Sequence, residues 1–280
     1  MLYIVMVLYK TRLEDSLTYK AVKRNLDKLK TLGTKILIYN NSPEIDVPLS
    51  DEYLVYTPTE NLMLAGAYNY ALEQANCSNS KWLLLLDQDT ELTKEYFDEL
   101  TNFLINPDSE NYDVVVPILK KDNIILSPEV YKKNYPFGTS RKITTNTDIS
   151  KIKKNEIFAA FNSSTLLRVD LLKMIGGFGN EFPLDMLDHY YFYKLNQVGA
   201  RFYVMHATFQ QNLSVLDKDS PMSTQRYALF VQATQKYVSI LGFRAVISFK
   251  IRLLFRIILQ IISPLKRRYV ILTIRQLFRF

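Results

Sequence analysis

The chain has 280 residues, of which 48% are hydrophobic and 22% charged, enough for one large domain or a domain with an appendage. The low counts of 8 Gly and 10 Pro exclude collagen-like proteins and most disordered classes. A single cysteine, Cys77, excludes an internal disulfide framework, and two histidines without CxxC or HExxH spacing exclude a self-sufficient zinc site. We therefore expect a globular, cytoplasmic protein.

Short apolar runs alternate with helical patterns along the first 120 residues. We expect strands over Leu2–Leu8, Lys35–Tyr39, Tyr53–Tyr56, Trp82–Leu86 and Val114–Pro117. Helical spacing of apolar residues predicts helices over Glu14–Leu32, Leu62–Ala75 and Lys94–Leu104. Continuous apolar runs such as Trp82–Leu86 are typical of strands buried on both faces of a parallel sheet. Strands that alternate with helices therefore predict a doubly wound α/β fold.

The middle of the chain is polar, and we expect residues Asp122–Lys154 to form a long surface insertion. After it, Ile157–Leu167 has strand character and Ile175–Gly179 is a turn. A helix is expected over Asp185–Val198 and a strand over Arg201–Met205. In that helix Asp185 would lie near the start, where the helix dipole favours an acid.

The C-terminal segment differs from the rest in charge. Residues 220–280 contain eleven Lys or Arg and no acid, which leaves residues 1–219 with 24 basic and 28 acidic residues, a balance of −4. We predict an α/β domain over 1–219 and a basic, apolar extension over 220–280, with helices at Gln225–Leu241, Arg244–Ile262 and Lys266–Arg279. The longest uncharged apolar run there, Ile257–Leu265, is about half of what a membrane span needs.

The extension must bury its apolar surface against the domain over residues 1–219, a second copy of the chain or a bilayer surface. Its Lys and Arg residues are scattered around the expected helices and do not form one clean basic face. An anionic membrane surface and a second copy of the chain remain open as partners. A nucleic-acid partner is disfavoured, because the basic residues alternate with long aliphatic side chains and no nucleic-acid motif occurs.

Two acids directly follow the apolar run Trp82–Leu86. Asp87 and Asp89 would lie at the carboxyl end of this strand, where open α/β sheets bind ligands. Two carboxylates one residue apart can reach one hard divalent cation, which would neutralise a diphosphate leaving group. The alternative is an ordinary surface turn.

A second pair of acids, Asp185 and Asp188, lies at the expected start of the helix over Asp185–Val198. A carboxylate there could act as a general base on an acceptor hydroxyl. The alternative is an N-cap acid followed by a solvated helix acid, which is common.

Taken in order, the motifs of this chain form a recognisable set. They are Ile38–Pro43, Asn61 with Ala67–Asn69, Trp82–Asp89, Phe161–Ser164, Ile175–Phe178, Leu184–Asp188 and Asn212–Ser214. Over roughly residues 1–216 the chain resembles family 2 glycosyltransferases of the GT-A fold, within them the bacterial rhamnosyltransferase-like branch. The resemblance implies a Rossmann-like, mixed but mostly parallel sheet flanked by helices.

The resemblance also assigns roles to residues of the motifs. Asp87 and Asp89 would hold Mn²⁺ or Mg²⁺ on the donor diphosphate, and Asp188 would be the catalytic base, with Asp185 as the second candidate. Other positions that match the donor site are Asn61, Asn69 and Gln88. Two positions depart from the family: Asn40 replaces the usual aspartate at the nucleotide, and Gln211 stands where many relatives carry a metal-binding histidine.

The implied function is inverting transfer of a sugar from dTDP-rhamnose or a UDP-hexose to a hydroxyl of a growing bacterial surface glycan, on a lipid carrier, or of a glycoprotein glycan. The protein would then work in the cytoplasm, at the inner face of the plasma membrane. Asn40 and Gln211 leave open a relative that binds nucleotide sugars with impaired catalysis. The extension leaves open a membrane-surface or assembly protein, including a homo-oligomer.

Overall fold

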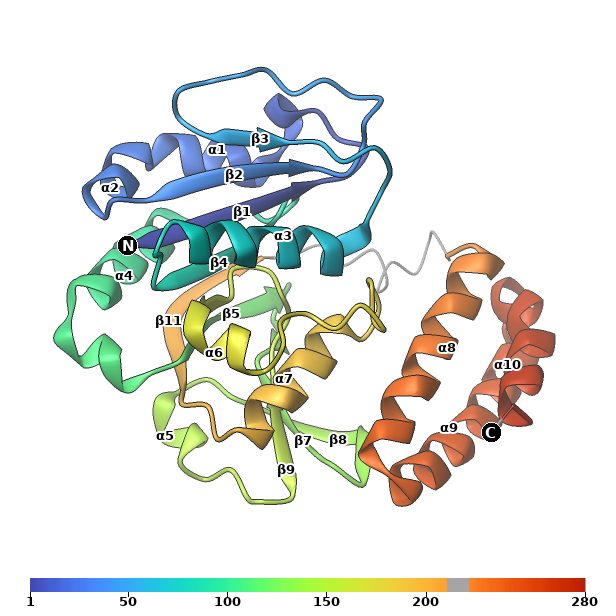
Figure 1. Cartoon of the computed structure of the whole chain (residues 1–280). Helices are drawn as coiled ribbons and strands as arrows, with labels where there is room; N and C mark the ends of the chain where they lie inside the picture. The colour runs from blue at the N-terminus through green and yellow to red at the C-terminus, as the bar shows by residue number, and fades with distance from the viewer. Residues whose placement is uncertain (211–221, 280) are drawn as a thin grey trace. The chain divides into compact units, whose positions relative to one another are not determined.

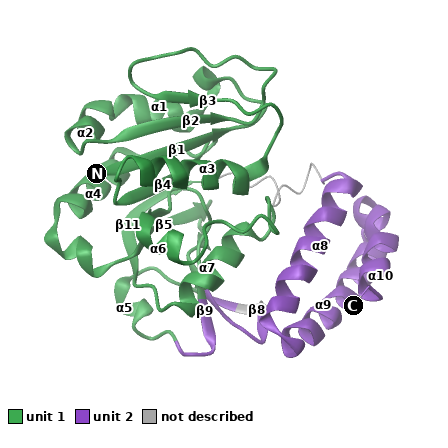
Figure 2. Cartoon of the chain, viewed as in Figure 1, with its two compact units in different colours: residues 1–129, 142–152, 158–211 green, residues 130–141, 153–157, 212–280 purple. Residues whose placement is uncertain are grey.

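The structure, a computed structural model, describes residues 1–210 and 222–279. The chain divides into two compact units (Figure 2), the first of residues 1–129, 142–152 and 158–211 and the second of residues 130–141, 153–157 and 212–280.

An eight-stranded mixed sheet forms the centre of the first unit (Figure 1). Its order is β11-β5-β10-β4-β1-β2-β3, and β6 pairs with β5. β1 is parallel to β2 and β4, whereas β10 is antiparallel to both β4 and β5. The bounds are β1 Leu2–Leu8, β2 Lys35–Asn40, β3 Leu54–Tyr56, β4 Trp82–Asp87, β5 Val114–Lys121, β6 Ile124–Ser127, β10 Leu166–Arg168 and β11 Phe202–Gln210. The expected α/β fold with a mostly parallel sheet is confirmed.

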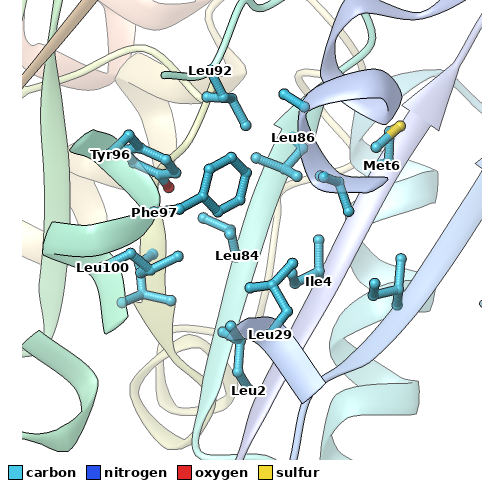
Figure 3. Close-up of a cluster of buried hydrophobic side chains, with 14 of the residues drawn as sticks. Leu2, Ile4, Met6, Leu29, Leu84, Leu86, Leu92, Tyr96, Phe97 and Leu100 are labelled. Carbon is cyan, nitrogen blue, oxygen red and sulfur yellow. The ribbon is translucent and has the colours of Figure 1, made fainter. Parts of the chain in front are cut away.

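Helices cover both faces of this sheet, which is why β1 and the apolar part of β4 are buried throughout. On one face, side chains of β1 and β4 pack against α1 Leu17–Arg24, α2 Leu26–Thr31 and α4 Lys94–Ile105 in one apolar cluster (Figure 3). α3 Met63–Cys77 packs on β1 and β4 and against α6 Val169–Met174. α7 Leu187–Gln197 and the short α5 Asn146–Ile149 complete the helices of this unit, with 3₁₀ turns at Leu13–Asp15 and Pro107–Asn111.

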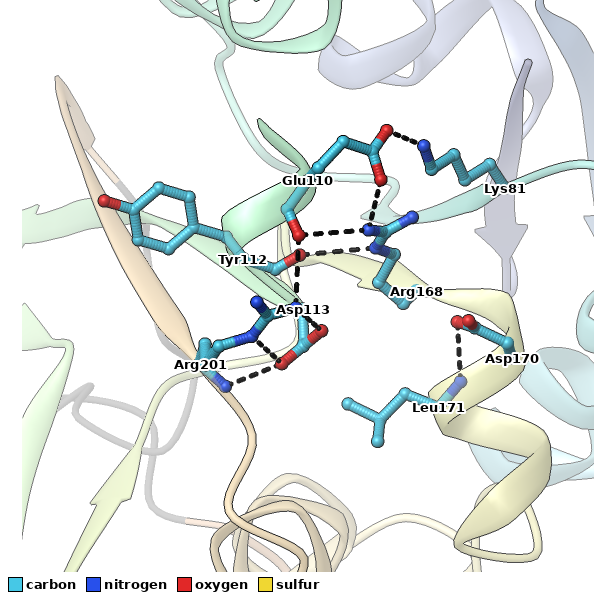
Figure 4. Close-up of polar contacts among 8 residues, drawn as sticks. All are labelled: Lys81, Glu110, Tyr112, Asp113, Arg168, Asp170, Leu171 and Arg201. Carbon is cyan, nitrogen blue, oxygen red and sulfur yellow. Dashed lines mark hydrogen bonds and ion pairs between the residues drawn. The ribbon is translucent and has the colours of Figure 1, made fainter. Parts of the chain in front are cut away.

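A polar network ties together the 3₁₀ turn at Pro107–Asn111, β5, β10 and β11 (Figure 4). Arg168, at the end of β10, donates to the Glu110 carboxylate at 2.8 Å and to the main-chain oxygen of Tyr112 at 3.3 Å. Its guanidinium lies over the Trp82 ring, 4.9 Å from the centroid. Next to it, Arg201 pairs with Asp113 at 2.8 Å. These contacts lie at the opposite end of β4 from Asp87.

Three expected elements differ in the structure. The single helix over Glu14–Leu32 is two helices, because Asn25 turns its amide back onto the carbonyl of Ala21 at 3.0 Å and ends α1. The expected strand over Ile157–Leu167 is two strands, β9 Glu156–Ala159 and β10. The helix expected from Asp185 begins at Leu187, since Met186 adopts a left-handed conformation with φ 61°.

The expectation that the polar middle of the chain forms a plain surface insertion is wrong. Residues 122–154 contain β6, β7 Glu129–Lys132, β8 Tyr135–Lys142 and α5. β8, β7 and β9 form a separate three-stranded sheet. In β7, Val130 and Tyr131 are buried while Lys132 is exposed. A short strand of this kind buries a few apolar side chains although the segment around it is mostly polar.

The second unit is mainly helical, with α8 Thr224–Leu241, α9 Phe243–Ile262 and α10 Val270–Leu277. The three expected helices are thus confirmed, except that the third begins with a 3₁₀ segment, Pro264–Tyr269, labelled η4. Within the part of the chain that the structure describes, we find no helix with the length and apolarity needed to cross a membrane.

Candidate active site

The carboxyl ends of β1, β2 and β4 meet at one edge of the sheet. In register, Leu8 of β1 lies opposite Asn40 of β2, and Val7 lies opposite Asp87 of β4. The loops that leave these three strands therefore start side by side, as in other open α/β sheets that bind ligands there.

The turn Asp87–Asp89 is held to its neighbours by main-chain contacts. Gln88 makes two reciprocal hydrogen bonds with Tyr9, accepting from its N–H at 2.7 Å and donating to its carbonyl at 3.1 Å. From the start of α1, the Ser16 hydroxyl donates to the Gln88 carbonyl at 2.7 Å, and the Thr18 hydroxyl accepts from the Thr90 N–H at 3.0 Å. The side chain of Gln88 thus positions the turn. The carboxylates of Asp87 and Asp89 take no part in these contacts.

Asp87 is partly buried and lies close to other acids. Burial, and then the negative charge of Asp89, raises the pKa of Asp87 from 3.8 to about 7. The charge of Asp188 acts in the same direction, whereas a hydrogen bond from the Tyr68 hydroxyl, at 3.2 Å, lowers the pKa. Burial also raises the pKa of Asp89.

Asp188 lies in the first turn of α7 and reaches the same place from a distant part of the chain. Burial raises its pKa, which His189 partly offsets by its charge and by a hydrogen bond from its N–H to the carboxylate at 2.8 Å. The pKa of Tyr191, raised mainly by burial, is raised further by the charges of Asp188 and Asp87. The structure therefore brings Asp87, Asp188, Tyr68 and Tyr191 together.

Asp185, the second candidate base, precedes α7 and lies outside it. Its charge contributes to the raised pKa of Asp188. Asp185 is therefore a close neighbour of Asp188, separated from the helix by the left-handed Met186.

Asn40 is buried, and its amide is used inside its own loop. It donates to the carbonyl of Ile45 at 2.7 Å and accepts from the N–H of Ser42 at 3.1 Å. The next residue, Asn41, joins this loop to the start of α3 through bonds with Leu62 and Met63, each 3.1 Å long. The role of Asn40 at the nucleotide stays a prediction.

The two asparagines assigned to the donor site hold main chain around α3. Asn61 accepts from the N–H of Met63 at 2.8 Å, where α3 begins. Asn69 donates to the carbonyl of Phe178 at 2.7 Å and accepts from its N–H at 2.9 Å. Asn69 thereby fixes the glycine turn that leads to α7, in which a Cβ on Gly177 would lie 2.6 Å from the Asn69 oxygen.

Tyr68 and Tyr191 are site residues that the sequence reasoning missed. Tyr68 stands inside the motif Ala67–Asn69, and Tyr191 follows Asp188 by three residues. Their spacing carries no signal for contact with Asp87, because that contact arises only when α3 and α7 pack against the sheet.

The donor set fits a hard divalent cation. Asp87 and Asp89 offer carboxylate oxygens, the ligands that Mn²⁺ and Mg²⁺ accept. Among residues 1–210 and 222–279, no Lys or Arg contributes to the pKa of Asp87, Asp89 or Asp188, and His189 is the one basic residue that does, at Asp188. The same residues contain no ready group of three or more His, Cys, Asp or Glu ligands, and Gln211 lies outside them.

A cavity of about 790 Å³ lies elsewhere in the first unit and includes none of the predicted site residues. Its charged lining residues are Arg24, Lys28, Glu91, Lys94, Lys120 and Asp122. Its openness to water and mixed charges give it no evident chemistry.

Solved structures with a similar fold are glycosyltransferases. GalNAc-T7 with UDP, GalNAc and Mn²⁺ matches with a TM-score of 0.53 and 12% identity, over 82% of this chain and 48% of that one. The S. aureus TarS fragment 1–349 in complex with UDP-GlcNAc matches with a TM-score of 0.51 and 15% identity, over 86% of this chain and 66% of that one. At these identities the likeness shows the GT-A fold, and this chain spans about half to two thirds of their length.

A comparison with curated proteins finds no match. The model of one protein family, glycosyl transferase family 2, matches residues 6–176. This match covers the sheet edge, Asp87 and Asp89, ends at Gly176 inside the glycine turn, and exceeds half of the chain. The chain therefore belongs to glycosyl transferase family 2.

Proposed function

We propose that this protein transfers a sugar from a nucleotide-diphosphate donor to an acceptor hydroxyl. One observation carries the proposal: Asp188, from α7, and the carboxylate turn after β4 converge at the carboxyl edge of the sheet, with no Lys or Arg among the described residues acting on their pKa values. A carboxylate cluster with no Lys or Arg beside it suits a site that receives a cation together with a diphosphate. Membership of family 2 supports glycosyl transfer as the reaction class.

Asp87 and Asp89 would hold Mn²⁺ or Mg²⁺. When bound, the cation would supply positive charge to the departing diphosphate. The chain itself keeps these two carboxylates in place through Gln88, Ser16 and Thr18, which fix the main chain of the turn. Gln211 remains a predicted additional ligand.

Asp188 is the proposed general base. Its raised pKa makes it a better proton acceptor than an exposed aspartate. It would take the proton of the acceptor hydroxyl as that oxygen bonds to the anomeric carbon. The bond from this carbon to the diphosphate oxygen breaks, and its electron pair leaves with the diphosphate. A single displacement of this kind inverts the anomeric configuration.

For the donor we propose dTDP-rhamnose or a UDP-hexose, and for the acceptor a growing surface glycan on a lipid carrier or a glycan on a protein. The donor assignment rests on the resemblance of the motifs to the rhamnosyltransferase-like branch. The fold likeness to TarS with UDP-GlcNAc is compatible with a uridine donor.

The decisive experiment is a donor screen with dTDP-rhamnose, UDP-glucose, UDP-galactose, UDP-N-acetylglucosamine and GDP-mannose, with and without Mn²⁺, read out as released nucleotide diphosphate. We expect metal-dependent release from one donor. Asp188→Asn should abolish transfer and leave donor binding nearly intact, whereas Asp185→Asn should retain much of the rate. Wild-type turnover by Asp188→Asn would show that the base is assigned wrongly. Donor binding without any turnover, acceptor included, would favour a nucleotide-sugar-binding protein.

A further inference from the structure

The helical unit has an interior of its own. Tyr227 of α8, Gln260 of α9 and Thr273 of α10 form a closed, buried hydrogen-bond network. The Gln260 amide donates to the Tyr227 hydroxyl at 2.8 Å, and the Thr273 hydroxyl lies 2.7 Å from the Tyr227 hydroxyl and 2.8 Å from the Gln260 oxygen. Tyr269 stacks on Tyr227 with 4.4 Å between ring centroids. These contacts fix the rotation of all three helices, and so decide which side chains face inward.

α9 is apolar on two sides, and only one of them packs into the interior of the helical unit. Ala245, Phe249, Leu253 and Gln260 are buried, on one side of the helix. The other side carries large exposed side chains at helical spacing: Phe243, Ile247, Ile251, Leu254, Phe255, Ile258, Leu259, Ile261 and Ile262. Phe255 and Leu259 are 64% and 65% exposed, far more than the inner side chains.

Exposed apolar side chains also occur in the segment that follows α9. Leu265 in η4, Ile271 and Ile274 in α10, and Phe278 just after α10 are also exposed, Phe278 at 79%. Soluble monomers rarely expose so many large apolar side chains in one region, so this surface calls for a partner.

Basic residues border the exposed apolar side. At about 3.6 residues per turn, Lys250 and Arg252 fall on its two margins, between the exposed and the buried sides of α9. Beyond α9, Lys266, Arg267, Arg275 and Arg279 are all exposed. Of the other basic residues of α9, Arg244 is exposed on the apolar side in the first turn of the helix, and Arg256 is half-buried toward the inner side.

We propose that this surface of α9, η4 and α10 lies on an anionic lipid bilayer, with its apolar side chains among the acyl chains and its bordering Lys and Arg at the head groups. The positive charge of residues 220–280 favours an anionic bilayer over a second copy of the chain. With eleven basic residues and no acid over 220–280, a second copy docked by the same face would bring like charges together. An anionic membrane surface complements both the charge and the apolar side chains, as for other helices that lie in the interface plane. The proposal is independent of the proposed function.

The test is flotation of the full chain with vesicles of phosphatidylcholine alone or with about a third phosphatidylglycerol. We expect binding to the anionic vesicles, weakened by salt because exposed charges are screened. The double variant Phe255→Gln/Leu259→Gln should bind about tenfold or more weakly. Its matched control, Leu49→Gln/Ile124→Gln, removes two exposed apolar side chains from the first unit and should bind like wild type.

The charge is tested separately by Lys266→Gln/Arg275→Gln, with Lys20→Gln/Lys35→Gln as a control of equal charge. Each lost charge in the extension should weaken binding about fivefold, whereas the control should change it little. Equal binding to both vesicle types, or no binding at all, would overturn the proposal. So would a dimer in sedimentation that Phe255→Gln/Leu259→Gln dissociates, since the face would then join two copies. Donor turnover without vesicles reports on the proposed function alone.

Discussion

The hydroxyl of Tyr68, in the middle of α3, donates a hydrogen bond to the carboxylate of Asp87, at the end of β4, over 3.2 Å. This is the one described contact that lowers the pKa of Asp87, against burial and the charges of Asp89 and Asp188. Tyr68 is therefore a positioning residue that keeps Asp87 available in its ionised form.

Tyr68→Phe should raise the pKa of Asp87 further and weaken divalent-cation binding about tenfold near neutral pH, because a hydrogen bond to a charged group is lost. The deficit should shrink at higher pH, where Asp87 ionises without help. Mn²⁺ titrations at two pH values measure both effects. Tyr70→Phe is the control, since Tyr70 lies on the same helix but stacks on Tyr56. Equal metal affinities of Tyr68→Phe and wild type would argue against this role.

The raised pKa of Asp87 predicts how stability depends on pH in the metal-free protein. The folded state holds the proton more tightly than the unfolded state, so the stabilisation present below pH 4 is lost as pH rises toward the folded pKa of about 7. We expect a loss on the order of 2–4 kcal/mol, visible as a falling melting temperature with EDTA present. Asp87→Asn should flatten this trend, whereas the exposed Asp122→Asn should leave it intact. An unchanged slope in Asp87→Asn would place the titrating group elsewhere.

Divalent cations should reverse that loss. Mn²⁺ binds the ionised carboxylates of the folded state, so it should raise the melting temperature most at pH 8 and hardly at all at pH 5. Either Asp87→Asn or Asp89→Asn should remove most of the increase. If both variants kept it, the cation would be bound by other residues.

The glycine turn before α7 offers a matched pair of substitutions. Gly176 and Gly177 both have positive φ, 77° and 67°, so alanine strains the backbone at either position. A Cβ at 176 meets nothing within 4 Å, whereas a Cβ at 177 would lie 2.6 Å from the Asn69 oxygen. We expect a cost of about 1 kcal/mol for Gly176→Ala and about 2–3 kcal/mol for Gly177→Ala, which adds displacement of Asn69.

Only Gly177→Ala should also reduce turnover, because Asn69 fixes the segment that carries Asp188. Chemical denaturation and donor turnover measure the two effects. Equal losses from both variants would mean that the contact with Asn69 contributes nothing.

Arg168 should matter for stability alone. Arg168→Leu leaves the Tyr112 carbonyl without this donor and removes the buried guanidinium that pairs with Glu110, for a loss of about 2–3 kcal/mol. Lys81 pairs with the same Glu110 from a more exposed position, so Lys81→Leu should cost less than about 1 kcal/mol. Turnover per folded molecule should stay unchanged in both. Reduced turnover in Arg168→Leu at full folding would contradict this separation.

The sequence predicted the elements that are decided by strong local patterns. β1, β2 and β4 lie within one residue of their expected bounds, because continuous apolar runs occur only where both faces of a sheet are covered. The strands of the polar middle escaped prediction, since β6 and β7 each have few covered positions and follow residues that favour turns. Asp122, with φ 54°, turns the chain between β5 and β6.

The sequence displays the acids of the candidate site but not the contacts that hold them in place. Asp87, Asp89 and Asp188 belong to motifs that the sequence displays. The contacts of Tyr68 with Asp87, and of Gln88 with Tyr9, join residues 19 and 79 positions apart. Such contacts depend on how α3 packs and on the register of β1 with β4. No local pattern encodes either of them.

The place of β10 in the sheet sets an order for synthesis. β5 meets β4 only through β10, which leaves the ribosome some fifty residues later. While the chain is being made, β1 to β4 can assemble with their helices, and the end of β5 can pair with β6, but Val114 and Val115 must wait for β10. A ribosome stalled before β10 would present the first half of β5 as an unpaired apolar edge, the kind of segment that chaperones bind.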